Sequence, residues 1–238
     1  MMYFSTLVCS LLLASVDSFQ ISCEQATDVE IGKDVTFNCT FECDGTCTPT
    51  VKWEKDHDAG ILYEYKESKS DFSKQHANYS GRIEVSTDSI NNGKVFLTLK
   101  NVSIWDEGTY IFRISTDGGF GKEDVHLSVW ANMDDIHIFW ESDSEVLSCM
   151  SSGWYPAPEV KWKDKFGNDL NEHSEKILMR ESNGYFNVSH SLKLFDEQNQ
   201  YICSIWHKWM DKPKQTRVIF SDGKSLISVD DGEKSSDL

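Results

Sequence analysis

The sequence predicts an all-β protein made of two tandem β-sandwich domains. Short runs of alternating apolar and polar residues recur between turn signals along its 238 residues, and no long stretch has the period of a helix. At roughly 100–150 residues per domain, this length fits two domains. Hydrophobic residues make up 39% and aromatic residues 12% of the chain, which is enough for two cores and excludes a wholly disordered protein.

The two halves of the chain contain similar sets of predicted strands. In the first half, the alternating runs fall at residues 35–39, 51–53, 61–65, 82–85, 95–99, 109–114 and 125–129. In the second half, they fall at residues 146–149, 160–162, 185–192 and 200–203. A short polar segment at 131–135 separates the halves, so we expect one domain over residues 19–130 and another over residues 136–220.

A repeated spacing of Cys, Trp and Tyr identifies the kind of sandwich. Trp162 follows Cys149 by 13 residues and Tyr201 precedes Cys203 by two, and the first half has the counterparts Cys39, Trp53 and Tyr110. In an immunoglobulin sandwich the two Cys bridge facing sheets, the Trp packs on the bridge and the Tyr hydroxyl fastens a corner. We therefore expect a Cys149–Cys203 disulfide and structural roles for Trp53, Trp162, Tyr110 and Tyr201.

The two ends of the chain are expected to lie outside the domains. Residues 1–18 contain an apolar run at 7–14 followed by small residues, which is the size of a signal-peptide core. Residues 221–238 are polar and acidic, and we expect a disordered tail there. These features predict an extracellular protein, on the outer side of the plasma membrane if the chain continues into a membrane span and secreted otherwise.

Charge and sequons restrict the partners. Lys and Arg total 23 against 39 Asp and Glu, a formal net charge of −16, and such a surface repels nucleic acid and anionic lipid. This charge favours a protein partner with a neutral or basic contact surface. N-glycosylation is expected in a secreted chain at the four Asn-x-Ser/Thr sequons, which begin at Asn38, Asn78, Asn101 and Asn187.

Several segments carry a family resemblance. The run Gly153-Trp154-Tyr155-Pro156-Ala157-Pro158 resembles the constant-type domain of butyrophilins and related T-cell costimulatory ligands. Residues 79–82, 95–102 and 106–110 resemble the variable-type domain of butyrophilins and myelin oligodendrocyte glycoprotein. The resemblance implies a variable-type domain followed by a constant-type domain, with a structural salt bridge between Arg82 and Asp106. It also implies a surface ligand that binds a receptor on T cells and regulates T-cell activation and cytokine production.

The first domain departs from the family pattern at its disulfide. The pattern asks for a Cys where this sequence has Phe112, so Cys39 lacks its partner on the facing sheet. Cys23, Cys43 and Cys47 are additional. In variable-type domains the first strand begins near the loop that follows the second strand, so we expect Cys23 to bond Cys43 or Cys47. Cys39 is then either a buried free thiol or a disulfide link between two copies of the chain. A second disulfide within this domain is also possible, but the sequence does not assign its partners.

The resemblance also places the receptor contact on the first domain. In relatives, receptors meet one sheet face and the loop that joins the last two strands. Here that loop, residues 116–121, has three Gly around Phe120, a composition suited to a flexible loop with an aromatic anchor. We expect Tyr63, Tyr65, Ile114 and Phe120 to contact the partner, with Phe120 folded back as the alternative. Tyr63 and Tyr65 alternate with Leu62 and Glu64 along the strand, so either the two tyrosines or Leu62 and Glu64 face outward.

Other functions compete with the T-cell ligand. A homophilic adhesion protein that forms a weak homodimer through the same face is one alternative, and a secreted decoy that occupies a receptor is another. An enzyme is not expected, because the sequence has no Gly-x-Ser-x-Gly, His-Glu-x-x-His or phosphate-loop motif. No cofactor or metal is expected either, since the spacing from Cys43 to Cys47 differs from the Cys-x2-Cys of zinc sites.

Overall fold

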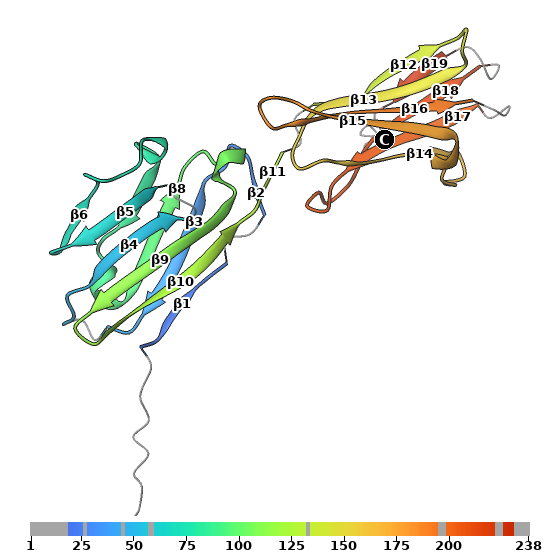
Figure 1. Ribbon diagram of the computed structural model, residues 1–238. Coiled ribbons are helices and arrows are strands. Elements are labelled where there is room, and N and C mark those ends of the chain that lie inside the picture. The colour runs from blue at the N-terminus through green and yellow to red at the C-terminus, as the bar shows by residue number, and fades with distance from the viewer. Residues whose placement is uncertain are drawn as a thin grey trace, which may run out of the picture.

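The chain forms two β-sandwich domains joined end to end (Figure 1). This computed structural model describes residues 19–25, 28–43, 46–56, 60–131, 134–194, 199–221 and 226–230. The predicted fold class is confirmed. The predicted signal peptide at residues 1–18 lies outside the described residues.

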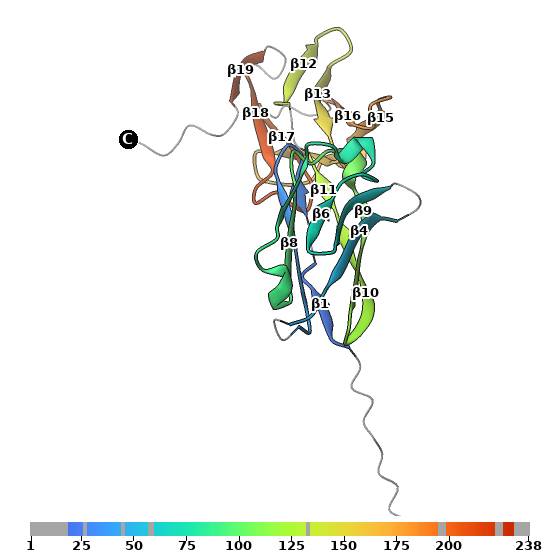
Figure 2. The same cartoon turned by 90° about the vertical axis from the view of Figure 1, so that its left-hand side faces the viewer.

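Two sheets form the first domain. One has the order β1-β3-β8-β7 and consists of β1 (Ile21–Cys23), β3 (Val35–Phe41), β8 (Lys94–Leu99) and β7 (Ile83–Ser86). The other has the order β10-β9-β4-β5-β6 and consists of β10 (Gly119–Leu127), β9 (Gly108–Thr116), β4 (Thr50–Lys55), β5 (Ile61–Lys66) and β6 (Lys69–Asp71). Figure 2 shows β8 in one layer and β9 and β10 in the other.

Shorter elements complete this domain. The strands β2 (Val29–Glu30) and β11 (Val129–Trp130) pair in parallel, next to the junction with the second domain. Three single-turn 3-10 helices lie in the connections: η1 (Ala77–Tyr79), η2 (Ile90–Asn92) and η3 (Ile104–Asp106).

Alternation along the strands builds the core of the first domain. Along β3 the odd-numbered residues are buried, whereas Thr36 and Thr40 are exposed, because successive side chains point to opposite faces of a sheet. The Trp53 ring lies at the centre, with its centroid 5.2 Å from that of Phe37 and 5.1 Å from that of Phe112. Phe112 therefore fills core volume at the position where the family pattern has a Cys, and full burial of such a side chain contributes roughly 1.5–3 kcal/mol.

The two disulfides of the first domain pair differently from the expectation. Cys23 bonds Cys39 and Cys43 bonds Cys47, so the expected bridge from Cys23 to the loop is wrong. The reason is the register of β1 and β3, which sets Cys23 directly opposite Cys39 with Cα atoms 4.1 Å apart. Cys39 is thus bonded, and its bridge joins neighbouring strands of one sheet, not the two facing sheets.

The second domain also has two sheets. One has the order β12-β13-β16-β15 and consists of β12 (His137–Glu141), β13 (Val146–Trp154), β16 (Phe186–Lys193) and β15 (Ser174–Arg180). The other has the order β14-β17-β18-β19 and consists of β14 (Glu159–Asp164), β17 (Gln200–Trp206), β18 (Lys214–Phe220) and β19 (Leu226–Asp230). The turn η4 (Asn171–His173) precedes β15. Cys149 and Cys203 bond across these two sheets, next to the buried Trp162.

Part of the predicted disordered tail is a strand. Residues 226–230 form β19, which pairs with β18 in antiparallel register, with Val218 opposite Val229. The expectation of disorder over 221–238 is therefore wrong for this segment. The run Leu226-Ile227-Ser228-Val229 contains β-branched and apolar residues that favour an edge strand. The rest of the predicted tail beyond Ser221 lies outside the described residues.

The two domains meet around Ala131. The Ala131 amide donates to the Tyr155 carbonyl at 2.7 Å, and the Tyr155 amide donates back to Ala131 at 3.1 Å. His207, after β17, places its Nε2 atom 3.0 Å from the Ala131 carbonyl oxygen. The His207 ring also contacts, with centroids 5.4–5.5 Å apart, the rings of Trp130, Trp154 and Trp209. The first residue of the predicted linker, Ala131, is therefore held by hydrogen bonds to the second domain.

Candidate partner-binding face

The outer surface of the β10-β9-β4-β5-β6 sheet is the candidate binding face. Opposite residues of antiparallel strands point to the same side of the sheet. Lys52, Arg113 and Lys122 form one such row across β4, β9 and β10. We call this surface the five-stranded face, and its outward side chains include Lys52, Glu54, Glu64, Arg113, Phe120, Lys122 and Asp124.

Three of the expected contact residues point the other way. Tyr63, Tyr65 and Ile114 are only 0%, 4% and 2% exposed, so the expectation that they contact a partner directly is wrong. The register explains this, since Tyr63 lies opposite Trp53, and Val51 lies opposite both Tyr65 and Ile114. Trp53 and Val51 face the core, and their register partners must do so too.

The buried hydroxyl of Tyr63 is satisfied inside the sheet. Its Oη atom lies 2.9 Å from Ser70 Oγ on β6, and its ring is 5.5 Å from that of Phe72. Burial raises the pKa of Tyr63, so the phenol stays protonated at neutral pH. Tyr63 thus supports the sheet from within.

Charged side chains replace the tyrosines on the outside. Glu54 accepts from Lys52 Nζ at 2.5 Å and from Arg113 Nε at 2.6 Å. Burial alone raises the pKa of Glu54, but the hydrogen bonds from Lys52 and Arg113 outweigh it and lower the pKa. The sequence carried a signal for these residues, because the neighbours of a buried Trp53 in a strand must face outward.

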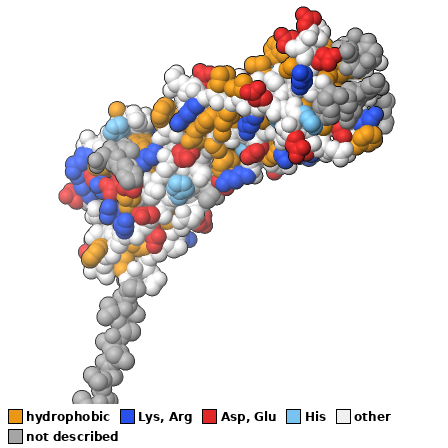
Figure 3. Space-filling view, turned by 45° about the vertical axis from the view of Figure 1, so that its right-hand side comes forward, with side chains coloured by type: hydrophobic (Ala, Val, Ile, Leu, Met, Phe, Trp, Pro, Cys, Tyr) orange, Lys and Arg blue, Asp and Glu red, His pale blue; other side chains and the backbone are white. Residues whose placement is uncertain are grey.

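Positive and negative side chains balance on this face. Lys52, Arg113 and Lys122 are set against Glu54, Glu64 and Asp124 in the same outward set. On the side of the first domain visible in Figure 3, Lys and Arg side chains are interspersed with Asp and Glu. The strong negative charge of the whole chain is therefore not concentrated here.

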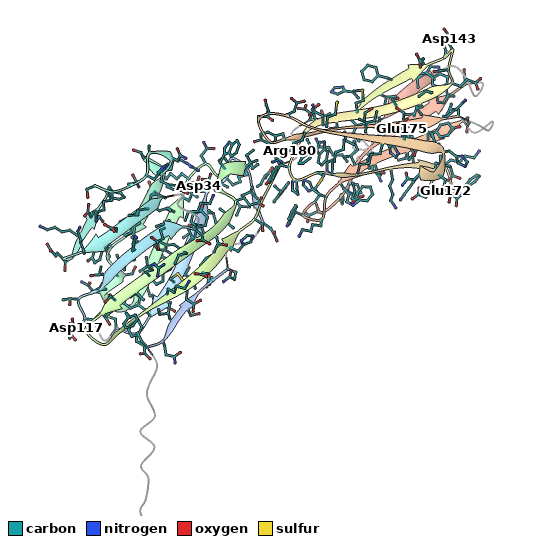
Figure 4. All side chains as sticks on the ribbon, viewed as in Figure 1. Asp34, Asp117, Asp143, Glu172, Glu175 and Arg180 are labelled. Carbon is teal, nitrogen blue, oxygen red and sulfur yellow. A yellow bond between two sulfur atoms is a disulfide. The ribbon has the colours of Figure 1, made fainter. Side chains whose placement is uncertain are left out.

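Phe120 is the exposed aromatic residue of the five-stranded face. It lies near the β9–β10 hairpin, at the end of the domain that Asp117 marks in Figure 4, and its side chain is 83% exposed. The expected exposure of Phe120 is confirmed, and the folded-back alternative is wrong. Beside it lies an open hollow of about 380 Å³, lined by Thr50, Lys52, Arg113, Ile114, Ser115, Phe120, Gly121 and Lys122.

The glycines around Phe120 allow a close approach of the N-terminal segment. A Cβ atom on Gly121 would lie 2.4 Å from Ile21 Cδ1, and one on Gly119 would lie 2.9 Å from the Phe19 side chain. The hairpin is thus packed against β1 on its other side, which differs from the flexible loop that we expected. This packing directs Phe120 outward.

A second hollow lies on the other side of Arg113. Its volume is about 440 Å³, and Glu54, Lys55, Asp56, Gly60, Ile61, Ile111 and Arg113 line it. Lys55 is held here by a hydrogen bond to the Trp105 carbonyl, 2.6 Å away, and burial lowers its pKa. Arg113 therefore separates two hollows, one bordered by an aromatic side chain and one by polar groups.

The asparagines of the three first-domain sequons lie outside the strands of this face. Asn38 is on β3, in the other sheet. Asn78 and Asn101 lie on either side of Arg82, whose guanidinium donates to both of their carbonyls at 3.1 Å. None of these three asparagines is therefore part of the five-stranded face.

Arg82 and Asp106 form the salt bridge that the resemblance implied. Arg82 Nη2 lies 2.6 Å from Asp106 Oδ2, and the Asp106 side chain is only 4% exposed. The hydrogen bonds of Asp106 raise the pKa of Arg82. The Tyr110 hydroxyl donates to the Asp106 carbonyl at 2.7 Å, so Tyr110 fastens the same corner.

Across the described part of the chain, no three His, Cys, Asp or Glu side chains gather as a metal site. The same residues include no helix with the length and hydropathy needed to cross a membrane.

The geometry of the five-stranded face, with an exposed aromatic residue and paired charges around open hollows, is typical of a surface that binds another protein.

The fold and this face define a tandem immunoglobulin-domain protein. Two family models match it: the immunoglobulin V-set domain over residues 23–130, and the butyrophilin subfamily 3 member A2-like Ig-C domain over residues 132–215. The chain therefore belongs to the immunoglobulin superfamily, with a V-set domain followed by a butyrophilin-like Ig-C domain.

Individual relatives agree with this assignment. V-set domain-containing T-cell activation inhibitor 1 of Rattus norvegicus is 33% identical over 187 residues, which cover 74% of this chain and 64% of that protein. Human butyrophilin subfamily 1 member A1 is 26% identical over 193 residues, covering 79% and 36%. The crystal structure of bovine butyrophilin shares the fold, with a TM-score of 0.73 and 23% identity over 84% of this chain and 99% of that one. The chain thus spans 64% or less of these two curated relatives.

Proposed function

We propose that this chain is an extracellular ligand whose five-stranded face binds a receptor on T cells and regulates T-cell activation. The observation that carries the proposal is Phe120, an 83% exposed aromatic side chain beside an open hollow. An exposed ring that can be buried by a partner is the usual form of a binding hot spot. Several relatives are T-cell activation inhibitors by name, which supports the T cell as the partner cell.

The charges of the face refine the nature of the receptor surface. Because cations and anions are paired and balanced here, a uniformly basic receptor surface is not required. A partner that alternates carboxylates and cations against Arg113 and Glu54 would complement this face best. Such charges set specificity and the association rate, and the apolar contact at Phe120 contributes affinity.

Binding to cells tests the proposal. The glycosylated full chain, labelled and multimerised, is applied to activated T cells and to cells that display the same chain. We expect binding to the T cells, and Phe120→Ala should weaken it about 30-fold, the equivalent of roughly 2 kcal/mol. Phe166→Ala is the matched control, because Phe166 is 75% exposed on the second domain. Binding only to cells that display the chain would instead identify a homophilic adhesion protein.

The regulatory part of the proposal needs a separate measurement. T cells stimulated on a surface that carries the chain should change their proliferation and cytokine release, and Phe120→Ala should reduce this change in proportion to its loss of binding. Unchanged binding and unchanged cytokine release with Phe120→Ala would contradict the role of the five-stranded face.

A further inference from the structure

The outer surface of the β12-β13-β16-β15 sheet exposes four large apolar side chains. Phe139 is 57% exposed, Met150 38%, Ile177 47% and Met179 50%. We call these four residues the apolar strip. The strand register sets their direction. Met150 and Phe139 alternate with the core-facing residues Cys149, Ile138 and Trp140. Ile177 and Met179 are register partners of Ser189 and Asn187, which alternate with the buried Val188 and His190, so all four point away from the core. Concentrated apolar exposure of this kind usually marks a surface that is covered in the functional molecule.

Small hydroxyl side chains lie between the members of the strip. Ser189 on β16 is the register partner of Met150 on one side and of Ile177 on the other. One row further along, Ser148 Oγ and Ser191 Oγ lie 2.8 Å apart. The surface therefore combines apolar side chains with hydroxyl groups, the two kinds of group that a sugar also presents.

Asn187 lies within this surface. It is the register partner of Met179, and it is two residues from Ser189, so Ile177 and Met150 are its diagonal neighbours. Opposite residues in such a sheet have Cβ atoms about 5 Å apart and diagonal residues about 7–8 Å. A group attached to the Asn187 side chain therefore begins in contact distance of three of the four members of the strip.

The Asn187 amide has one hydrogen that a sugar can replace. Its Nδ2 atom donates one hydrogen to Glu181 Oε1 at 2.7 Å, which leaves the other hydrogen free for replacement. N-glycosylation forms the bond from Nδ2 to C1 of the first sugar and breaks the sugar–diphosphate bond of the lipid-linked donor, and the displaced proton leaves with the diphosphate. The remaining Nδ2–H can keep the bond to Glu181 after modification.

We propose that an N-linked glycan on Asn187 folds over the apolar strip and covers it. The C–H faces of its sugar rings pack on Met179, Ile177 and Met150, and its hydroxyls bond the serines between them. A glycan rooted within the strip excludes a protein partner from it by its bulk. The constant-type domain is then closed to contacts on this sheet, and the five-stranded face of the other domain stays open.

Methionine oxidation measures this cover directly. Thioether oxidation by dilute peroxide follows solvent exposure, and the oxidised peptides are quantified by mass spectrometry. In glycosylated full-length protein from a mammalian secretory host, Met179 and Met150 should oxidise about threefold more slowly than after enzymatic removal of the glycan from the folded protein. The partly buried Met210 is the internal reference and should not change.

Two substitutions of one residue provide the matched control. Ser189→Ala destroys the sequon and should give the fast oxidation of Met179, whereas Ser189→Thr keeps the sequon and should keep the slow oxidation. Glycan-free protein should also bind more of a hydrophobic dye. An unmodified Asn187, or equal oxidation of Met179 and Met150 with and without the glycan, would overturn the proposal.

Discussion

The imidazole Nε2 of His207 lies 3.0 Å from the carbonyl oxygen of Ala131, so a side chain of the second domain holds the end of the first. Because a carbonyl oxygen only accepts hydrogen bonds, Nε2 must carry the proton. His207 is 4% and Ala131 is 2% exposed, so the contact is closed to solvent. The junction is thus a buried polar contact inside a shell of tryptophan rings.

His207→Phe should loosen this junction without unfolding either domain. Phe retains ring contacts with the surrounding tryptophans but cannot donate to Ala131. We expect faster protease cleavage at residues 131–135 and a wider spread of domain orientations in small-angle X-ray scattering. His137→Phe, at an exposed position on β12, is the control and should behave like the unmodified protein. Identical cleavage rates for all three proteins would show that the hydrogen bond does not hold the junction.

The salt bridge between Arg82 and Asp106 should contribute several times more to the free energy of unfolding than an exposed salt bridge does. Asp106→Ala leaves the Arg82 guanidinium partly buried without its partner, and we expect a loss of about 3 kcal/mol in the free energy of unfolding. Glu84→Ala breaks the more exposed pair with Lys100 and should cost less than about 1 kcal/mol. Urea unfolding of the full chain compares them, and equal losses would contradict the structural role of Asp106.

The contribution of each of the three disulfides to stability should increase with the length of the loop that it closes. In the chain-entropy model, loss of Cys149–Cys203 costs about 4 kcal/mol, loss of Cys23–Cys39 about 3 and loss of Cys43–Cys47 about 2. Paired Cys→Ser substitutions, one bridge at a time, test this by thermal unfolding. Non-reducing peptide mapping is the first check. A bond from Cys23 to Cys43 or Cys47 would contradict the register of β1 and β3.

His190 should make the second domain sensitive to acid. Its ring is 3% exposed with Nε2 2.7 Å from Ser174 Oγ, and burial, with the charge of Lys176, lowers its pKa from 6.5 to about 4. Below pH 6.5 the unfolded chain binds a proton that the folded chain excludes. The stabilisation is therefore complete above pH 6.5 and is lost as the pH falls towards 4.

Urea unfolding at pH 7.5, 5.5 and 4.5 measures this dependence. We expect the second domain to lose about 2–3 kcal/mol over this range through His190. His190→Gln removes the titrating group and should flatten the dependence, even if it lowers stability at every pH. His137→Gln, at an exposed position, should retain the full slope. An equally steep slope in His190→Gln would assign the acid sensitivity to other groups.

Local patterns were sufficient to predict the fold. The spacing of Cys149, Trp162, Tyr201 and Cys203 reflects contacts that every such sandwich needs, and it identified the domain type. The binding face was harder, because whether Tyr63 points inward depends on its register with Trp53. That register is a long-range property with a β-bulge at Trp53 and Glu54, and alternation within one strand does not determine it.

The predicted pairing of the first-domain cysteines was wrong for a related reason. The expectation for Cys23 rested on which loop the first strand approaches in relatives. In this chain the pairing of β1 with β3 places Cys23 opposite Cys39. The position of Phe112 did reveal that the usual inter-sheet bridge was missing, but only the strand register could show what replaced it.

The placement of the Cys23–Cys39 bridge has a mechanical consequence at a contact between two cells. Neither disulfide of the first domain crosses between its sheets, so packing and the loops between strands hold the sheets together, and a pull across that interface would strain the packing first. A load applied at Phe120 does not cross it. The tension enters β10 at the hairpin and runs along the backbone through β11 to Ala131. The strand that carries the contact is also the tether to the second domain, whose own sheets are covalently linked.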